Sequence, residues 1–297
     1  MEQLNQIIEK LKINVLSIED VPDSFSSTVY KVEQVNKRVV YLKIPYSKVK
    51  LVREYEAIEI LSEVLPVPRL LGYWEGDDDI PGALLLSEIK GQPLSGKVDD
   101  ILAYDIGVHH AKLHNVSPQK DNTYKGISNV YEQWSTFTET HFYGFAEDVK
   151  EVLPEDLLKQ SIELFEEQRK CLPNPDGPSF IHMDFRPANI IIHDNQISGI
   201  IDFESARFGA TEMDFTKINR DAFSQNPGTL EAYKKGYQSI RPLIDLDFIL
   251  PFYRFTDAFN SLGWCKRRGI EKHQRFFDES YIILKSILQN ERQHKHL

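Results

Sequence analysis

The sequence of 297 residues is poor in cysteine. Its two cysteines, Cys171 and Cys265, lie far apart along the chain. Isolated thiols of this kind exclude a disulfide framework and the paired cysteine spacing of a zinc site. No apolar run reaches the roughly 20 residues that a membrane-spanning helix needs. The first residues lack a basic region followed by an apolar core, so we expect no secretory signal and a cytoplasmic protein without a membrane partner.

Basic residues are fewer than acidic ones. Lys and Arg number 35 against 45 Asp and Glu, which gives a formal net charge of −10. Nucleic-acid binding depends on neutralising phosphates with basic side chains, so we expect no nucleic-acid partner. An acidic surface is compatible with a cationic ligand, although it more often serves solubility. The apolar content of 41% is that of a globular protein, and the length fits one large domain or two lobes that share a cleft.

One segment carries a pattern with chemical meaning. It places His182, Asp184 and Asn189 close together, and Asp202 follows shortly afterwards. His, any residue, Asp, four residues and Asn, followed by a further Asp, is the pattern of a kinase catalytic loop. Four matching residues in order are a specific signal, whereas a single match would not be. We expect Asp184 to accept or orient the proton of an attacking hydroxyl.

The residues after this loop predict a β-hairpin. Two β-branched runs flank the polar residues 194–196, as in a hairpin with a short turn. With the turn centred on residues 195–196, Asn189 lies opposite Asp202 at the open end. An amide oxygen and a carboxylate are hard ligands suited to Mg²⁺, so we predict a magnesium site at this pair. The alternative, a simple capped hairpin, leaves the upstream catalytic-loop residues unexplained.

The first part of the chain predicts a small α+β lobe, and the remainder a larger, mainly helical lobe. Alternating apolar residues predict strands at 26–33, 38–44 and 84–89, and a helix at 47–65. Asp99 or Asp100 can cap a helix whose apolar stripe runs from Leu102 to Leu113. Further helices are expected in pieces over 130–170, and near 228–238, 245–262 and 273–290. A Gly-Pro-containing break after residue 89 sets the boundary, with lobes of 1–90 and 91–297.

The helix at 47–65 carries a glutamate on its inward face. Glu54 lies at helical spacing between apolar residues that face the core. A carboxylate facing a core is costly unless it is paired, and Lys43 on the preceding strand is the obvious partner. Lys43 held in this way would present an ammonium group to nucleotide phosphates. The alternative is an ordinary salt bridge at the edge of a lobe.

The connection between the first two strands offers hydroxyl and backbone N–H groups to phosphates. We predict that Ser26 and Ser27 take this role. The connection contains no glycine, so it matches neither the glycine-rich loop of protein kinases nor a P-loop. An ordinary polar turn is the alternative.

Further motifs accompany the catalytic loop along most of the chain. They are Leu42-Lys43-Ile44, Arg53-Glu54-Tyr55-Glu56, Pro66-Val67-Pro68, Leu85-Leu86-Ser87-Glu88 and His110-Ala111-Lys112-Leu113-His114. Together with the loop and hairpin, they resemble the aminoglycoside phosphotransferase family. These are small-molecule kinases with a protein-kinase-like fold, and macrolide and choline kinases are relatives.

The resemblance implies a two-lobed α+β fold, with an antiparallel sheet and one main helix in the N-terminal lobe. It implies that Lys43 contacts phosphates, that Glu54 holds Lys43 and that Asp184 is the catalytic base. It further implies that Asn189 and Asp202 bind Mg²⁺. A hinge whose backbone meets the purine would comprise Ser87, Glu88 and Ile89. The implied nucleotide is ATP, with GTP as an alternative.

Two departures from the kinase pattern stand out. Phe203-Glu204 replaces the Phe-Gly that follows the metal-binding Asp in protein kinases. Arg186 stands two residues after the catalytic Asp, where serine/threonine kinases carry Lys. We hypothesise that Arg186 neutralises charge on the transferring phosphoryl group; a salt bridge within the loop is the alternative.

The function that follows is transfer of a nucleotide γ-phosphate to a hydroxyl of a small molecule. A protein kinase fits less well, because the short interval after Asp202 leaves no room for a long activation segment. A nucleotide-binding pseudokinase is a second alternative, although every expected catalytic residue type is present. The sequence leaves open the oligomeric state and the acceptor: an antibiotic such as an aminoglycoside or macrolide, or a metabolite, with a cationic acceptor among the options.

Overall fold

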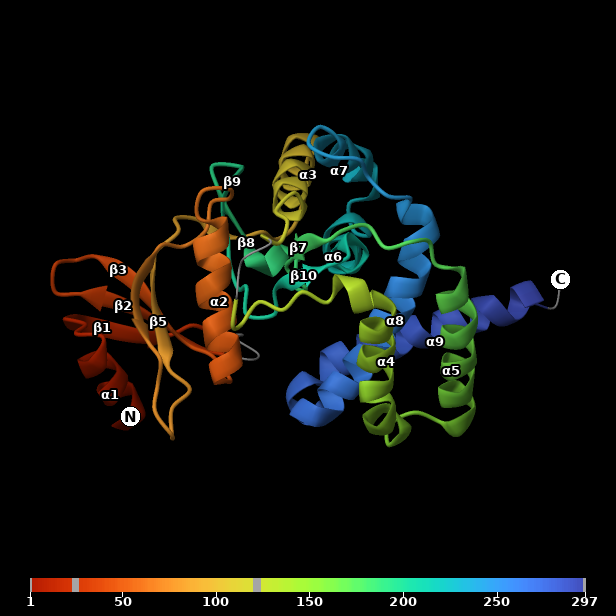
Figure 1. Ribbon diagram of the computed structural model, residues 1–297, viewed down its shortest axis with the longest axis horizontal. Coiled ribbons are helices and arrows are strands. Elements are labelled where there is room, and N and C mark those ends of the chain that lie inside the picture. The colour runs from red at the N-terminus through yellow and green to blue at the C-terminus, as the bar shows by residue number, and fades with distance from the viewer. Residues whose placement is uncertain (1, 23–26, 120–123, 296–297) are drawn as a thin grey trace. The chain divides into compact units, whose positions relative to one another are not determined.

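The computed structural model describes residues 2–22, 27–119 and 124–295 (Figure 1). The chain folds into two compact units, each built from separated stretches of sequence. The first comprises Met1–Asn129, Pro178–Gly209 and Lys217–Leu243, and the second Val130–Gly177, Ala210–Thr216 and Ile244–Leu297. The predicted catalytic loop and the predicted nucleotide-binding sheet thus belong to the same unit. The division into lobes at residue 90 stays a prediction.

A five-stranded antiparallel sheet forms the N-terminal part of the first unit, in the order β1-β2-β3-β5-β4. Its strands are β1 Val15–Asp20, β2 Thr28–Gln34, β3 Val39–Ile44, β4 Leu70–Trp74 and β5 Ala83–Ser87. Helix α1 (Glu2–Lys10) contributes Ile7 to a core with the alternate residues Val32, Val40 and Leu42 of the sheet. The α+β class and the antiparallel N-terminal sheet predicted from the sequence are confirmed.

Helix α2 (Lys48–Leu61) lies beside β5 in Figure 1. Ser47 precedes it in an extended conformation, and the helix ends before the first proline, as predicted. Its buried residues recur at helical spacing and are Leu51, Glu54, Ala57, Ile58 and Leu61. The predicted inward orientation of Glu54 is confirmed, because only 1% of this residue is exposed.

The predicted hairpin forms, with strands β8 (Ile190–His193) and β9 (Gln196–Ile200), but its predicted register was wrong. Asp194 and Asn195 form the turn, with φ angles of 49° and 59°. A two-residue turn of this type needs positive φ at both central positions, which Asp and Asn tolerate better than Gln. A register shift within the hairpin follows, and Ile201 donates its N–H to the carbonyl of Asn189 at 3.0 Å. Asn189 is therefore paired with the neighbour of Asp202.

One further strand joins the hairpin, and two others form a separate pair. β6 (Gln92–Pro93) pairs with β8, and β7 (Ser179–Ile181) pairs antiparallel with β10 (Arg207–Gly209). The catalytic-loop segment leaves β7, and the chain after Asp202 enters β10. Both segments are thereby fixed by the same two-stranded pair.

Helices α3 (Asp100–His114) and α7 (Leu230–Gln238) pack closely in the first unit and lie side by side in Figure 1. Asp99 caps α3 by accepting the N–H of Leu102 at 2.8 Å, as its sequence predicted. The close approach depends on glycine. A methyl group at Gly107 would overlap the carbonyl oxygen of Tyr233, and one at Gly236 would overlap that of Tyr104.

The second unit is helical, as predicted for these segments. Its long helices are α4 (Trp134–Lys150), α5 (Glu155–Gln168), α8 (Leu246–Arg268) and α9 (Gln274–Lys295). Its core is aromatic: Phe142 stacks on Phe165 and Phe259 with ring centroids 4.0 and 4.2 Å apart. The aromatic residues of α4 and α8 at this position therefore serve packing. In the parts of the chain that the structure describes, no helix is long and apolar enough to cross a membrane.

Gly107→Ala tests the close packing of α3 on α7. The added methyl group forces the helices apart, and we expect the free energy of unfolding to fall by about 1–3 kcal/mol. Urea denaturation followed by circular dichroism measures the change. Gly228→Ala is the control, because a methyl group there would meet open space. Equal stability of the two variants would contradict the packing argument.

Candidate active site

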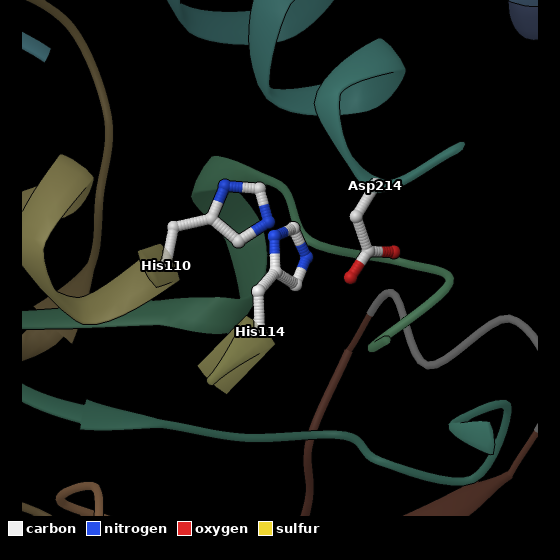
Figure 2. Close-up of side chains that lie close together, drawn as sticks. All are labelled: His110, His114 and Asp214. Atoms are coloured by element: carbon white, nitrogen blue, oxygen red, sulfur yellow. The ribbon is translucent and has the colours of Figure 1, made fainter. Parts of the chain in front are cut away.

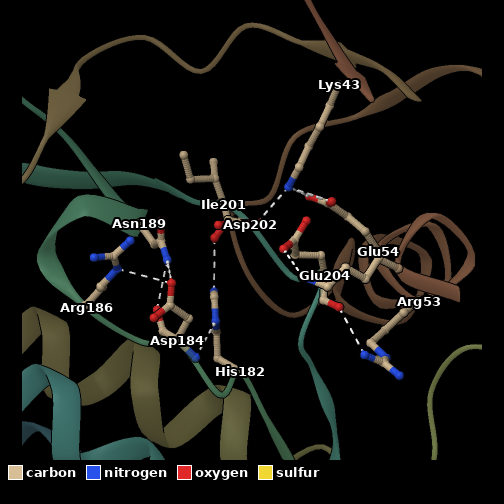
Figure 3. Close-up of polar contacts among 11 residues, drawn as sticks. Lys43, Arg53, Glu54, His182, Asp184, Arg186, Asn189, Ile201, Asp202 and Glu204 are labelled. Atoms are coloured by element: carbon tan, nitrogen blue, oxygen red, sulfur yellow. Dashed lines mark hydrogen bonds and ion pairs between the residues drawn. The ribbon is translucent and has the colours of Figure 1, made fainter. Parts of the chain in front are cut away.

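A buried lysine joins the sheet to helix α2 and to the segment after the hairpin. Lys43 on β3 places Nζ 2.8 Å from Oε1 and 2.6 Å from Oε2 of Glu54. The same Nζ lies 2.7 Å from Oδ1 of Asp202 (Figure 3). Only 5% of Lys43 is exposed. The predicted Lys43–Glu54 pair is thus present, and Asp202 is its third member.

The charges of this cluster depend on one another. Burial alone would lower the pKa of Lys43, but Asp202 and Glu54 raise that pKa above its ordinary value, so the ammonium stays charged. Burial would likewise raise the pKa of Asp202, yet the contact with Lys43 lowers it. Burial raises the pKa of Glu54, and Lys43 opposes this effect. Removing the lysine would leave two carboxylates close together without their shared cation, which is strongly destabilising.

The catalytic loop holds Asp184 through its own residues. Oδ2 of Asp184 accepts a hydrogen bond from Nε of Arg186 at 3.1 Å and one from Nδ2 of Asn189 at 3.0 Å. The same Nδ2 donates to the backbone carbonyl of Asp184 at 2.9 Å. Met183 has a φ of 68°, an unusual conformation for a non-glycine residue, and it turns the chain immediately before Asp184.

A lysine that the sequence analysis missed contacts the other oxygen of Asp184. Lys217 lies on α6 (Asp214–Ile218) and places Nζ 2.6 Å from Oδ1. Burial alone would raise the pKa of Asp184, but Lys217 and Arg186 lower that pKa well below its ordinary range. Asp184 is therefore a carboxylate at neutral pH. A single lysine in a short helix, 33 residues from its partner, has no signal in the sequence pattern.

His182 connects the catalytic loop to the strand that leads to Asp202. Its Nε2 lies 3.0 Å from the carbonyl oxygen of Ile201, and its Nδ1 accepts the N–H of Asp184 at 3.3 Å (Figure 3). The histidine of the motif thus positions both predicted carboxylates. Asp202 itself has a φ of 69°, which turns its side chain out of the strand direction.

Helix α2 is tied to the segments around the site by charged side chains. Nζ of Lys50 lies 2.6 Å from Oε1 of the buried Glu204. Arg53 donates to the carbonyl oxygens of Glu204 at 3.2 Å and Gly126 at 3.0 Å. Glu204, which departs from the protein-kinase pattern, is therefore a partner of α2.

Glu56 makes the most extensive of these attachments. Its carboxylate accepts the backbone N–H groups of Lys125, Gly126 and Ile127 at 2.7, 2.8 and 2.9 Å. Glu56 lies outside the buried face of α2 that holds Glu54, on a side of the helix that contacts residues 125–127. Helical spacing does not show that a distant loop covers that side.

A pair of histidines supports the catalytic loop from α3. His110 and His114 lie one turn apart on this helix (Figure 2). Nδ1 of each lies 2.8 Å from a tyrosine hydroxyl of α7, that of Tyr233 for His110 and of Tyr237 for His114. His110 stacks on Phe185, the residue after Asp184, with ring centroids 3.9 Å apart. The packing of α3 on α7 thus continues into the catalytic loop.

The predicted phosphate loop and hinge are placed only in part. Ser26 lies outside the described residues, and Ser27 directly precedes β2. Ser87 ends β5, and both its N–H and its Oγ are engaged with the backbone of Arg69. Ile89 packs over Gly199, whereas Glu88 is exposed and lies beyond the end of β5. Their roles toward a nucleotide stay predictions.

The residues predicted to bind Mg²⁺ fit a hard cation by their chemistry. Both donor bonds of Asn189 come from Nδ2, so this network orients the amide oxygen Oδ1 away from Asp184. Lys43 contacts Oδ1 of Asp202, which leaves the second carboxylate oxygen as a candidate ligand. An amide oxygen with one carboxylate oxygen is a typical protein contribution to a magnesium site completed by phosphates.

A strand lysine held by a helix glutamate, beside a loop that carries Asp184 and Asn189, is the arrangement of a protein-kinase-like fold. The chain belongs to the phosphotransferase enzyme family, whose model matches residues 17–252. The resemblance to aminoglycoside phosphotransferases inferred from the motifs is confirmed. No curated protein matches the chain.

Solved structures share the whole fold at low sequence identity. The GDP and kanamycin complex of APH(2")-IIia is 17% identical with a TM-score of 0.75, and the match covers 98% of this chain and 99% of the other. The macrolide 2'-phosphotransferase MphH from Brachybacterium faecium is 15% identical with a TM-score of 0.71, over 96% and 98%. ADP-bound APH(2")-Ib is 16% identical with a TM-score of 0.63, over 97% and 96%.

Glu56→Ala tests the attachment of α2 to residues 125–127. Three backbone N–H groups lose a charged acceptor, and we expect local opening to become easier by about 1–3 kcal/mol. Hydrogen exchange of these three amides measures the change. Glu59→Ala, on the exposed side of the same helix, is the control. Unchanged exchange in Glu56→Ala would contradict the proposed attachment.

Proposed function

We propose that this phosphotransferase is a small-molecule kinase that transfers the γ-phosphate of ATP or GTP to an acceptor hydroxyl. The observation that carries the proposal is the contact of Lys43 with both Glu54 and Asp202. This contact supplies a charged ammonium group and a metal-binding carboxylate on the same side as the catalytic loop. The predicted N-terminal lobe, residues 1–90, would then bind the nucleotide, and residues 91–297 would supply the catalytic loop and the acceptor site.

In the proposed reaction, the acceptor oxygen forms a bond to the γ-phosphorus while the bond to the β–γ bridging oxygen breaks. Asp184 accepts the hydroxyl proton, and the electron pair of the broken bond stays on the departing nucleoside diphosphate. Lys43 contacts the nucleotide phosphates. Asn189 and Asp202 would hold Mg²⁺, which neutralises phosphate charge when bound. Arg186, whose Nε lies 3.1 Å from Oδ2 of Asp184, would neutralise charge on the transferring phosphoryl group.

The similar structures support a nucleotide and a small acceptor. GDP, ADP and kanamycin occur in complexes of proteins with this fold, and others are macrolide phosphotransferases. We therefore propose a hydroxyl-bearing antibiotic or metabolite as the acceptor. A nucleotide-binding pseudokinase is the second candidate, but every expected catalytic residue type is present, and Lys43 and Glu54 are already paired. A protein kinase is disfavoured by the short segment after Asp202.

Asp184→Asn tests the proposed base. The change keeps the size of the side chain but removes the proton acceptor, so we expect kcat to fall by about 10²–10⁴. ADP or GDP release is measured with a panel of aminoglycosides, macrolides and metabolic alcohols. Calorimetric binding of Mg-nucleotide, expected to stay near the wild-type affinity, is the control. Transfer that survives in this variant would refute the assignment, and tight binding without turnover of any acceptor by the wild type would favour the pseudokinase.

Arg186→Ala tests whether Arg186 stabilises charge in the transition state. If it neutralises the transferring phosphoryl group, kcat falls by about tenfold or more, while KM for the nucleotide changes less. Arg186→Lys keeps the charge and is the matched control. An unchanged kcat in the alanine variant would leave Arg186 as a salt-bridge partner of Asp184 alone.

A further inference from the structure

The two carboxylate oxygens of Asp184 have different kinds of partner. Oδ2 is held by Arg186 and Asn189, which belong to the same short loop. Among the residues that the structure describes, Lys217 is the one side chain that donates to Oδ1. One oxygen is therefore fixed by local geometry, and the other is covered by a single side chain from a distant helix.

The side chain of Lys217, which contacts Oδ1, can change its conformation. A lysine side chain has four rotatable carbons and a compact ammonium group, whereas the guanidinium of Arg186 is planar and the amide of Asn189 is buried. The side chains of Lys217 and Asp184 are 30% and 21% exposed, so solvent and a substrate can reach their contact.

We propose that Lys217 is a positioning residue that occupies Oδ1 of Asp184 until an acceptor hydroxyl displaces it, and thereby suppresses transfer of the γ-phosphate to water. This inference rests on the proposed function. Water that reached Oδ1 would be oriented by the same carboxylate that serves the acceptor. The bound ammonium excludes it, because a water molecule would have to replace a charged hydrogen bond of 2.6 Å.

The suppressed reaction is hydrolysis of the nucleotide. The oxygen of water bonds to the γ-phosphorus, and the bond to the β–γ bridging oxygen breaks. One proton of the water passes to Asp184, and the electron pair stays on the departing group, so the products are the nucleoside diphosphate and inorganic phosphate. An acceptor bound through its own contacts brings its hydroxyl to Oδ1 at high effective concentration and can displace the ammonium, which bulk water does poorly.

The test is release of ADP from Mg-ATP in the absence of any acceptor. Lys217→Met removes the ammonium while keeping the apolar stem, and we expect hydrolysis to rise about threefold or more above wild type. Lys217→Arg keeps a charged donor and is expected to stay near wild type. Lys234→Met, which removes another ion-paired lysine of the same unit, is the matched control with no expected change. The gain must vanish in the double variant Asp184→Asn/Lys217→Met.

A rise in hydrolysis distinguishes this role from a purely structural one, since loss of structure lowers catalysis. Lys217→Gln is the second variant if the methionine variant does not fold, with the same expectation. Hydrolysis equal to or below wild type, with Mg-ATP affinity unchanged by calorimetry, would overturn the inference and leave the proposed function intact. Failure of the wild type to bind Mg-ATP or Mg-GTP would instead overturn the proposed function, and the inference with it.

Discussion

The contact of Lys43 with Glu54 and Asp202 is the interaction on which the rest of the site depends. A buried ammonium group is costly unless it is paired, and here one cation satisfies two carboxylates from separate segments. The sheet, helix α2 and the segment after the hairpin must all be in place for this to happen. Lys43 is therefore charged and correctly oriented only when these three parts of the first unit have assembled.

Further charged side chains of α2 also bind segments around the site. Lys50 pairs with Glu204, and Arg53 binds the carbonyl of the same residue, so the segment that follows Asp202 is held at two further points. Glu56 fixes the loop at 125–127 from the next turn of the helix. Together with the contact of Glu54 to Lys43 on β3, one helix thus carries charges of both signs to three different segments. A shift of α2 would break all of these contacts together. The position of Asp202 is set by the helix as much as by the strand that precedes it.

The sequence predicted the parts of the site that local periodicity encodes. Glu54 had to face inward because its neighbours at helical spacing are apolar, and Lys43 on the adjacent strand was its natural partner. The hairpin was predicted from its β-branched runs, but its register was wrong because turn conformation depends on which two residues adopt positive φ. The contacts of Glu56 were not predicted, because its partners are backbone groups 69 to 71 residues away.

By itself, the sequence determined the residue types of the catalytic loop, their order, and the strands and helix that carry Lys43 and Glu54. These features follow from the spacing of residues along one helix or strand, which does not depend on tertiary contacts. The tertiary structure decided which oxygen of Asp184 each cation contacts, since Lys217 and Arg186 reach it from different segments. It also decided that Glu204 is a partner of α2. Such pairings form because the packed elements bring distant residues together, so the periodicity of the sequence cannot predict them.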